Sequence, residues 1–184
     1  LVARPPASRR VRIGIARDEA FGFYYPDDLE ALEAAGATLL PIDMLRDTRL
    51  PSIDGLFIGG GFPEAFLPQL GANAALRAAL RTAIAQGLPT YAECGGLMFL
   101  ARSIRWNDRI AQMVGAIPAD VVMRERPVGR GYVRLAQTAD HPWPMPALDA
   151  ECLGHEFHHS ELVNADPGLR YAYTVQRGHG IDGG

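Results

Sequence analysis

The sequence predicts an α/β fold with a mostly parallel central sheet. Over the first hundred residues, short apolar runs that end at Gly or Pro alternate with helical segments rich in Ala and Leu, which is typical of βα units. The last third carries strand patterns without helices between them, so we expect some antiparallel strands there. With 184 residues, of which 48% are apolar and 21% charged, the chain can bury a core of its own.

The first regular pattern is the β-type run at residues 11–16. It follows ten residues that carry two prolines and three arginines without periodicity. We therefore interpret 1–10 as a linker or tail and 11–184 as one domain. The chain stops at Gly183-Gly184 within a Gly-rich turn that has no closing element, so we expect this domain to be truncated at its C-terminus.

Helices and further strands follow in alternation. A helix is expected where Pro26 and two acidic residues suit a first turn and Gly36 closes the segment, and another at 73–86, which stops at Gly87. A third helix is expected at 97–104. The remaining runs predict strands at 37–42, 55–58, 88–92, 121–123, 132–135 and 171–175, with a Pro-rich stretch at 141–146.

Composition excludes several function classes. The net charge of −3 gives no basic surface for nucleic acid or anionic lipid, and the apolar runs are too short to span a membrane. All 18 basic residues are Arg, so a P-loop, which needs Lys, and Schiff-base chemistry are excluded. Two cysteines and the lack of a signal peptide predict a cytoplasmic location.

The segment Glu93-Cys94-Gly95-Gly96 carries the most chemical information. It places a cysteine at the end of a predicted strand, before two glycines and a helix, which is the arrangement of a nucleophile elbow. In such an elbow the N–H of the next residue, here Gly95, points at the developing oxyanion. A helix N-terminus also favours the thiolate. The alternative is that Cys94 is a small core residue, as most cysteines are.

A thiol nucleophile needs a base, and three of the five histidines lie at 154–160. In an extended segment His155 faces the side opposite to Glu156 and His158, so the three histidines cannot all face one sulfur. The spacing does not choose among them. Together with Cys152 they also provide zinc-ligand types. Motifs such as C-x-x-C are absent and the alternating faces scatter the ligands, so we expect no metal site.

A third motif is the glycine run at 59–61, followed by Phe62-Pro63-Glu64. It comes after a buried strand pattern, and the carboxyl ends of strands carry the ligand crevice in α/β sheets. Consecutive glycines let backbone N–H groups approach a ligand, so Gly60 and Gly61 are candidates for the second oxyanion donor. The phosphate motif G-x-G-x-x-G is not matched because Glu64 stands at its last glycine. A tight turn without function is the alternative.

Taken together, these motifs resemble the class I (triad-type) glutamine amidotransferase domains, and among them the glutaminase domains of the cobyrinic and hydrogenobyrinic acid a,c-diamide synthases. The resemblance runs from 13–25 through 54–64 and the Cys94 elbow to 154–158. It implies a flavodoxin-like, three-layer α/β fold with Cys94 as nucleophile. The last histidine of the G-x-E-x-H pattern, His158, is implied as its base.

The resemblance assigns further roles. The backbone N–H groups of Gly60, Gly61 and Gly95 would form the oxyanion hole, and Glu93 and Phe62 would bind glutamine. His155 would be structural.

The sequence also departs from the family pattern. Simple class I glutaminases have a Glu two positions after the catalytic His, and here that position is Ser160, so a Cys-His dyad is expected. His159 stands where Tyr is usual, and Gly131-Tyr132-Val133-Arg134 separates the usual Gly-Tyr-Arg. Neither of these two departures touches the expected chemistry.

In this family the glutaminase is joined to an N-terminal ATP-dependent synthetase domain, which this chain lacks. The implied partners are glutamine, that synthetase domain of the same polypeptide and, through it, a corrin whose a and c carboxylates receive ammonia in cobalamin biosynthesis. ATP and Mg²⁺ would belong to the synthetase domain, with no cofactor in this one. A homodimer is left open.

Three other interpretations keep part of the pattern. An amidase or cysteine hydrolase of the same fold would use Cys94 and His158 on another small substrate, and an amidotransferase could serve a related tetrapyrrole. In a binding module without activity, Cys94 would be buried and unreactive.

Overall fold

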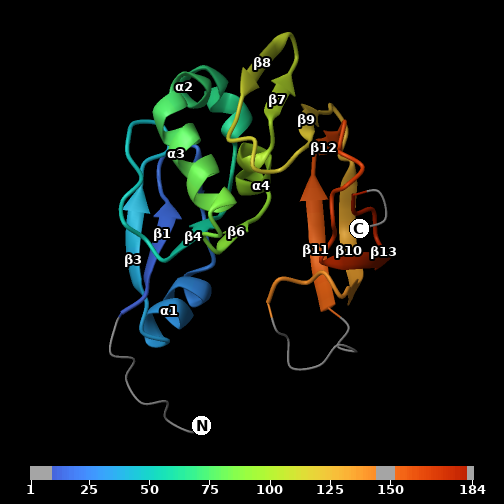
Figure 1. Cartoon of the computed structure of the whole chain (residues 1–184). Helices are drawn as coiled ribbons and strands as arrows, with labels where there is room; N and C mark the ends of the chain where they lie inside the picture. Colours follow the sequence, from blue (N-terminus) through green and yellow to red (C-terminus); the bar gives the residue numbers. More distant parts are fainter. Residues whose placement is uncertain (1–9, 144–151, 182–184) are drawn as a thin grey trace, which may run out of the picture.

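The computed structural model describes residues 10–143 and 152–181 (Figure 1). The expected linker therefore lies, apart from Arg10, outside the described residues. So do the expected chain end at Gly183-Gly184 and the second half of the Pro-rich stretch at 141–146.

A four-stranded parallel sheet forms the centre of the N-terminal part, in the order β3-β1-β4-β6. In the middle of β1, Gly14 pairs with Leu40 on one side and Leu56 on the other. The predicted strands are confirmed as parallel strands, with β4 in the centre largely buried and β3 and β6 at the edges more exposed. The four strands are β1 (Arg12–Ala16), β3 (Thr38–Ile42), β4 (Gly55–Ile58) and β6 (Thr90–Ala92).

Helices cover this sheet on both faces. The crossovers from β1 to β3 and from β4 to β6 step in opposite directions, so right-handed connections place α1 and α3 on opposite faces. Figure 1 shows α3 in front of the strands, where it buries Leu76 and Leu80. The helices are α1 (Pro26–Ala34), α2 (Leu67–Ala72), α3 (Ala74–Ala85), α4 (Gly95–Leu100) and one 3₁₀ turn, η1 (Pro63–Phe66).

The third predicted helix is partly wrong. Helix α4 ends at Leu100, Ala101 is extended with ψ 174°, and residues 103–106 form a strand. Ile104 is fully buried and pairs with Val121 on a neighbouring strand, so tertiary pairing overrides the helical pattern of the segment.

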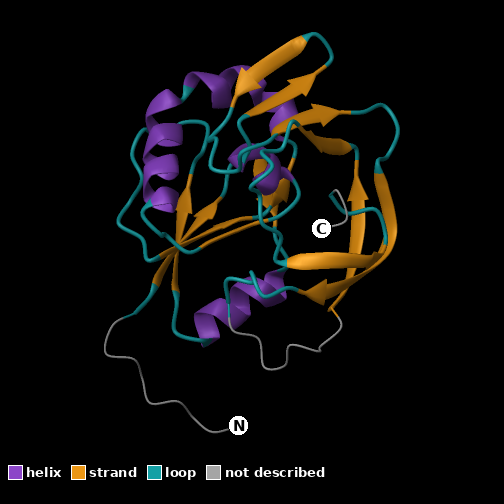
Figure 2. Cartoon of the chain, turned by 45° about the vertical axis from the view of Figure 1, so that its right-hand side comes forward, coloured by secondary structure: helices purple, strands orange, loops and turns teal. Residues whose placement is uncertain are grey.

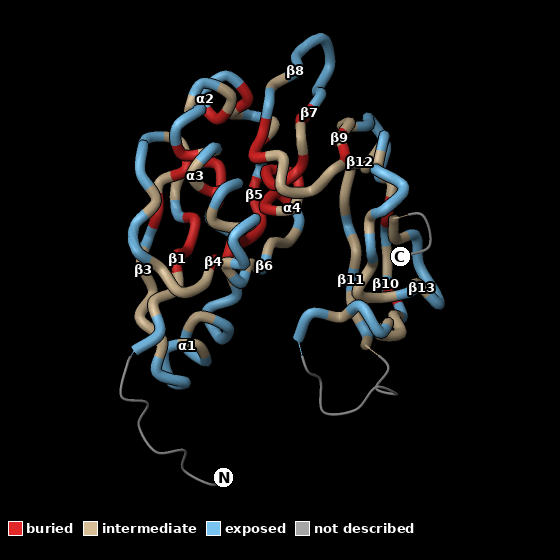
Figure 3. Tube along the Cα trace, viewed as in Figure 1, coloured by how far each residue is buried: buried red, intermediate tan, exposed pale blue. Residues whose placement is uncertain are grey.

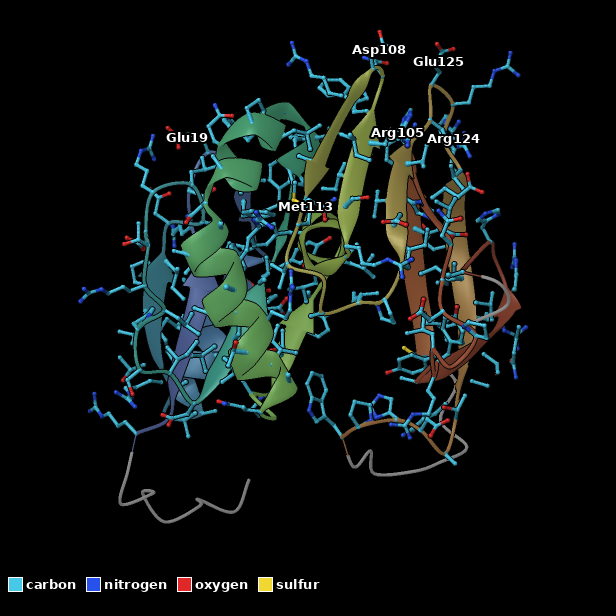
Figure 4. All side chains as sticks on the ribbon, turned by 45° about the horizontal axis from the view of Figure 1, so that its top comes forward. Glu19, Arg105, Asp108, Met113, Arg124 and Glu125 are labelled. Atoms are coloured by element: carbon cyan, nitrogen blue, oxygen red, sulfur yellow. The ribbon has the colours of Figure 1, made fainter. Side chains whose placement is uncertain are left out.

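This strand belongs to a second sheet of order β12-β9-β7-β8, in which only β7 and β9 are parallel. Figure 4 shows Asp108 and Glu125 projecting from loops at its ends, while Met113 is enclosed. Its strands are β7 (Ser103–Trp106), β8 (Arg109–Gln112), β9 (Asp120–Met123) and β12 (Ser160–Val163).

A third, antiparallel sheet has the order β11-β10-β13 and stands beside the α/β part (Figures 1 and 2). It confirms the antiparallel strands expected toward the C-terminus, although the last strand lies two residues later than predicted. A short pair, β2 (Phe21–Phe23) with β5 (Gly60–Gly61), lies next to the carboxyl end of β4. The third sheet consists of β10 (Gly129–Gln137), β11 (Cys152–His158) and β13 (Tyr173–Arg177).

The buried core lies mainly in the α/β part, as Figure 3 shows by colour. Its fully buried side chains include Phe21, Phe99 and Ile58, and the two aromatic rings have centroids 5.3 Å apart. Within 10–143 and 152–181, no helix is long and apolar enough to cross a membrane.

Candidate active site

Cys94 occupies a sharp turn between β6 and α4. Its backbone has φ 51° and ψ −114°, a conformation that costs a non-glycine residue about 1–3 kcal/mol and persists only where its surroundings enforce it. They do so here, because the Glu93 N–H donates to the Ile58 carbonyl at 3.1 Å and the Gly96 N–H to the Glu93 carbonyl at 2.8 Å. The thiol is exposed. The predicted nucleophile elbow is thus present in the backbone.

Glycines allow α4 to begin directly against the glycine run. A Cβ atom on Gly95 would lie 2.7 Å from the carbonyl oxygen and 2.9 Å from the nitrogen of Gly61, and one on Gly96 would overlap the Ile58 carbonyl. Any side chain at these positions would push the two segments apart. The Gly95 N–H lies in the first turn of α4, where backbone N–H groups have no partner within the helix.

The glycine run is positioned by its antiparallel pairing with β2. Gly61 pairs with Phe21, and a Cβ on Gly61 would overlap the Ala20 carbonyl. The Cβ position of Gly60 lies 3.7 Å from the Cβ of Cys94. The structure therefore brings Gly60, Gly61 and Gly95 together beside Cys94, although the motifs lie more than 30 residues apart in the sequence.

A cavity of about 960 Å³ separates this elbow from the antiparallel sheet. Gly60, Glu93 and Cys94 line it from one side, and Glu156 and His158 from the other. These residues come from β5, the β6–α4 turn and β11. The fold therefore brings the proposed nucleophile and base, which are about 60 residues apart in the sequence, to the same cavity.

Phe62 does not line the cavity. Its ring is 58% exposed and makes an edge-to-face contact with Phe23, with centroids 5.4 Å apart. The structure thus places this expected glutamine-binding residue beside the cavity, next to Gly61, and not within it.

Glu93 does line the cavity, and its carboxylate accepts a hydrogen bond from the Tyr91 hydroxyl at 3.2 Å. Burial, together with the negative charge of Glu93, raises the pKa of Tyr91 to about 12. The phenol therefore remains a hydrogen-bond donor to Glu93 throughout the neutral range.

Strand β11 alternates as the sequence predicted. His155 is exposed and its ring contacts Tyr132, with centroids 5.9 Å apart, although it also borders the cavity, which Glu156 and His158 line as half-buried residues. His159 lies beyond the strand, and its Nδ1 is 3.2 Å from the Arg124 carbonyl oxygen. Of these three histidines, His158 is the one that both lines the cavity and lies beside the Glu156 carboxylate, with Nε2 3.6 Å from Oε2.

The His158 ring is held by the backbone. Its Nδ1 lies 2.8 Å from the carbonyl oxygen of Ser160, so we assign the Nδ1–H tautomer, which leaves the Nε2 lone pair to accept a proton. Ser160 occupies the position at which simple class I glutaminases have a Glu. Its backbone carbonyl orients the imidazole although its side chain is too short to do so.

Sequence reasoning assigned no role to Glu156. Its Oε2 lies 3.6 Å from Nε2 of His158, and its carboxylate accepts the N–H groups of His179 at 2.7 Å and Gly180 at 3.3 Å. Burial raises the pKa of Glu156, but these two donors and the His158 ring outweigh it and hold the pKa below its usual value. Alternation placed Glu156 beside His158, while the turn at 178–180 gave no signal in the sequence.

Two further observations concern ionisable groups near the site. Burial raises the pKa of Glu64, and its Oε2 is buried with no hydrogen-bond partner among the residues described. In the same described part of the chain, no group of three or more His, Cys, Asp and Glu side chains is arranged to hold a metal ion.

Comparison with known proteins agrees with this geometry. The CobB/CobQ-like glutamine amidotransferase domain matches residues 12–183. A cobyrinate a,c-diamide synthase of Magnetococcus marinus is 46% identical over 175 residues, which cover 95% of this chain and 37% of that protein. A protein of the same name in Methanosarcina barkeri is 37% identical over 201 residues, covering 97% of this chain and 38% of that protein.

The chain thus spans somewhat more than a third of the length of these curated relatives. Among solved structures, PurLQS from Thermotoga maritima superimposes with a TM-score of 0.66 at 15% identity, over 92% of this chain and 76% of that one. This likeness concerns the fold, and it confirms the expected class I amidotransferase architecture. The match over 12–183 shows that the chain belongs to the CobB/CobQ-like glutamine amidotransferase domain family.

Proposed function

We propose that the chain is the glutaminase domain of a glutamine-hydrolysing cobyrinate or hydrogenobyrinate a,c-diamide synthase. The observation that carries this proposal is the strained, exposed Cys94, which shares a cavity with His158 and lies beside three glycine backbones. That combination supplies a nucleophile, a base and oxyanion donors to one substrate carbonyl.

The reaction begins when Nε2 of His158 takes the thiol proton of Cys94. The thiolate then attacks the side-chain amide carbon of glutamine, and the backbone N–H groups of Gly95 and the Gly60-Gly61 run stabilise the oxyanion. As the C–N bond breaks, the imidazolium gives its proton to the leaving nitrogen, and ammonia departs. The product is a thioester on Cys94.

Water completes the cycle. His158 removes a proton from the attacking water, the C–S bond of the thioester breaks, and the imidazolium returns the proton to the leaving sulfur, which releases glutamate and restores the free thiol. Glu93 and Phe62 are proposed to bind the glutamine substrate. Glu93 lines the cavity and Phe62 flanks the glycine run.

The ammonia would be used outside this chain. We propose that the remainder of the longer synthase activates the corrin a and c carboxylates with ATP and Mg²⁺, and that ammonia attacks them there. The lysine-free sequence has no P-loop for ATP, which agrees with this division. Both described cysteines are unpaired, which supports a cytoplasmic location.

Labelling with the glutamine analogue diazo-oxonorleucine tests this function. We expect one adduct on Cys94 by mass spectrometry, none on Cys94→Ser, and labelling at least a hundredfold slower in His158→Ala because the base is missing. Cys152→Ser is the matched control and should label like the wild type, since Cys152 lies in β11 and is not among the residues that line the cavity. An unlabelled wild type that is folded would contradict the glutaminase function.

A second assay separates glutamine from other substrates. Ammonia release is measured from glutamine, asparagine and simple primary amides. Release from another amide but not from glutamine would identify an amidase of the same fold. To identify the acceptor, the full-length synthase is supplied with cobyrinate, hydrogenobyrinate or another tetrapyrrole.

A further inference from the structure

The His158 ring has a different polar neighbour at each of its two nitrogens, the Ser160 carbonyl and the Glu156 carboxylate. Nδ1 of His158 is anchored at 2.8 Å by the Ser160 carbonyl, while Nε2, the nitrogen that must accept the proton, lies 3.6 Å from Glu156 Oε2. This second distance is too long for a direct hydrogen bond but close for two opposite charges. Ser160 fixes the orientation of the ring, and Glu156 provides a negative charge at its reactive nitrogen.

A separate turn holds Glu156 in place. The N–H groups of His179 and Gly180 donate to its two oxygens at 2.7 and 3.3 Å. Gly178 and Gly180 both have positive φ, at 118° and 64°, so consecutive N–H groups point to one side and form a small anion-binding concavity. We call residues 178–180 the carboxylate cradle.

Two glycines let the backbone approach this carboxylate closely. A Cβ on Gly178 would lie 3.1 Å from Oε1 of Glu156. A Cβ on Gly129 of β10 would lie 2.7 Å from Oε2 of Glu156 and would overlap Nε2 of His158. Strand β10 and the turn after β13 therefore both leave room for the pair, and a larger residue at either position would crowd it.

We propose that Glu156 is a positioning residue that stabilises the imidazolium form of His158 by facing Nε2 with a carboxylate, while the Ser160 carbonyl holds Nδ1. This inference rests on the proposed function, because it concerns the base of that reaction. When Cys94 gives its proton to Nε2, the carboxylate faces a full positive charge, which favours the thiolate–imidazolium pair over the neutral pair.

Other charged groups near the pair do not replace Glu156. His179 is a further titratable side chain beside the pair, and its ring centroid lies 6.3 Å from that of His158. Across the cavity, Glu93 accepts a hydrogen bond from the Tyr91 hydroxyl. On β12, Glu161 forms an ion pair with Arg124 at 2.6 Å.

The test compares Glu156→Gln with Glu161→Gln in the 184-residue chain. Both variants remove one carboxylate from the lining of the same cavity, but only the first faces His158. The ¹⁵N shifts of the His158 ring at a fixed pH of about 6.5 give the fraction of imidazolium. We expect this fraction to fall in Glu156→Gln and to match the wild type in Glu161→Gln.

The second measurement is the pH profile of Cys94 alkylation by iodoacetamide, which needs no glutamine site. In Glu156→Gln we expect the profile to move about one unit toward higher pH, which is about a tenfold slower reaction at pH 7. Glu156→Asp, which keeps the carboxylate but shortens the side chain, should shift the profile less and in the same direction. This variant also serves if Glu156→Gln does not fold.

Each outcome decides between the two proposals. Unchanged ring shifts and an unchanged pH profile in folded Glu156→Gln would overturn the role of Glu156, as would equal changes in Glu161→Gln. If the wild type fails to react with diazo-oxonorleucine, the glutaminase function fails, while the ring nitrogen shifts still show whether Glu156 stabilises the imidazolium.

Discussion

Replacement of Gly95 by Ala tests whether the oxyanion donors depend on contact between two glycine backbones. The added Cβ would lie 2.7 Å from the Gly61 carbonyl oxygen and 2.9 Å from both the Gly61 nitrogen and Cδ of Pro63, whereas ordinary contacts begin at 3.4 Å. The obstacle is backbone and a proline ring, which cannot swing away. The α4 turn and the glycine run must therefore separate by about 0.7 Å.

This displacement moves the proposed donors and Cys94 relative to each other. A misplacement of about 1 Å in an active site, or the loss of one oxyanion donor, slows a reaction roughly 10²-fold or more. We therefore expect diazo-oxonorleucine to label Gly95→Ala about a hundredfold more slowly than the wild type. Overpacking of this kind should also lower the free energy of unfolding by about 1–3 kcal/mol.

The assay pairs the glutamine analogue with iodoacetamide, whose attack by the thiolate needs no oxyanion hole. Iodoacetamide should react with Gly95→Ala less than tenfold more slowly. Gly168→Ala is the matched control, because its Cβ would meet no atom within 4 Å, and it should behave like the wild type in both assays. A folded Gly95→Ala protein labelled by the glutamine analogue at the wild-type rate would refute the reasoning.

Three further predictions concern stability. Leu80 is fully buried, so Leu80→Ala should lower the free energy of unfolding in urea by about 3 kcal/mol, whereas Leu153→Ala, at a side chain that is 71% exposed, should change it by less than about 0.5 kcal/mol. The Asn73 side chain accepts the Leu76 N–H at the start of α3 and donates to two loop carbonyls, so Asn73→Ala should cost about 1–2 kcal/mol, and a loss of less than 0.5 kcal/mol would exclude this capping role. Burial raises the pKa of Tyr24 to about 12. The stability that the neutral Tyr24 phenol contributes is therefore complete below its unfolded-state pKa near 10 and is lost as the pH rises through 12. Urea unfolding at pH 9 and 11.5 should show a loss of about 1 kcal/mol from this source after allowance for partial exposure, and the same loss in Tyr24→Phe would contradict the assignment.

Local patterns in the sequence predicted the parts of the site that depend on neighbouring residues. The elbow at Cys94 was predictable because a strand, a nucleophile, two glycines and a helix must follow one another directly in the chain. The alternation of β11 was also predictable, and it placed His158 and His155 on opposite faces. The spacing of the histidines did not choose among them; the family resemblance implied His158, and the fold adds that its ring lines the same cavity as Cys94.

Long-range contacts explain what the sequence did not predict. Residues 101–104 continue an apolar helical pattern, but the pairing of Ile104 with Val121 turns them into a strand. The role of Glu156 depends on His179, 23 residues later in the chain, whose backbone and not its side chain makes the contact. A pattern of side chains carries no signal for such a contact.

The uneven distribution of the core has a consequence for hydrogen exchange. Cys94 borders a densely packed α/β part, whereas the sheet β11-β10-β13, which carries His158, contributes among its described residues only Val133 to the buried apolar side chains. Opening of that sheet thus exposes little apolar surface and costs less free energy than global unfolding. Amide protons of β10 and β11 should exchange well before those of β1 and β4, so the nucleophile keeps its geometry in states in which the base has already moved away.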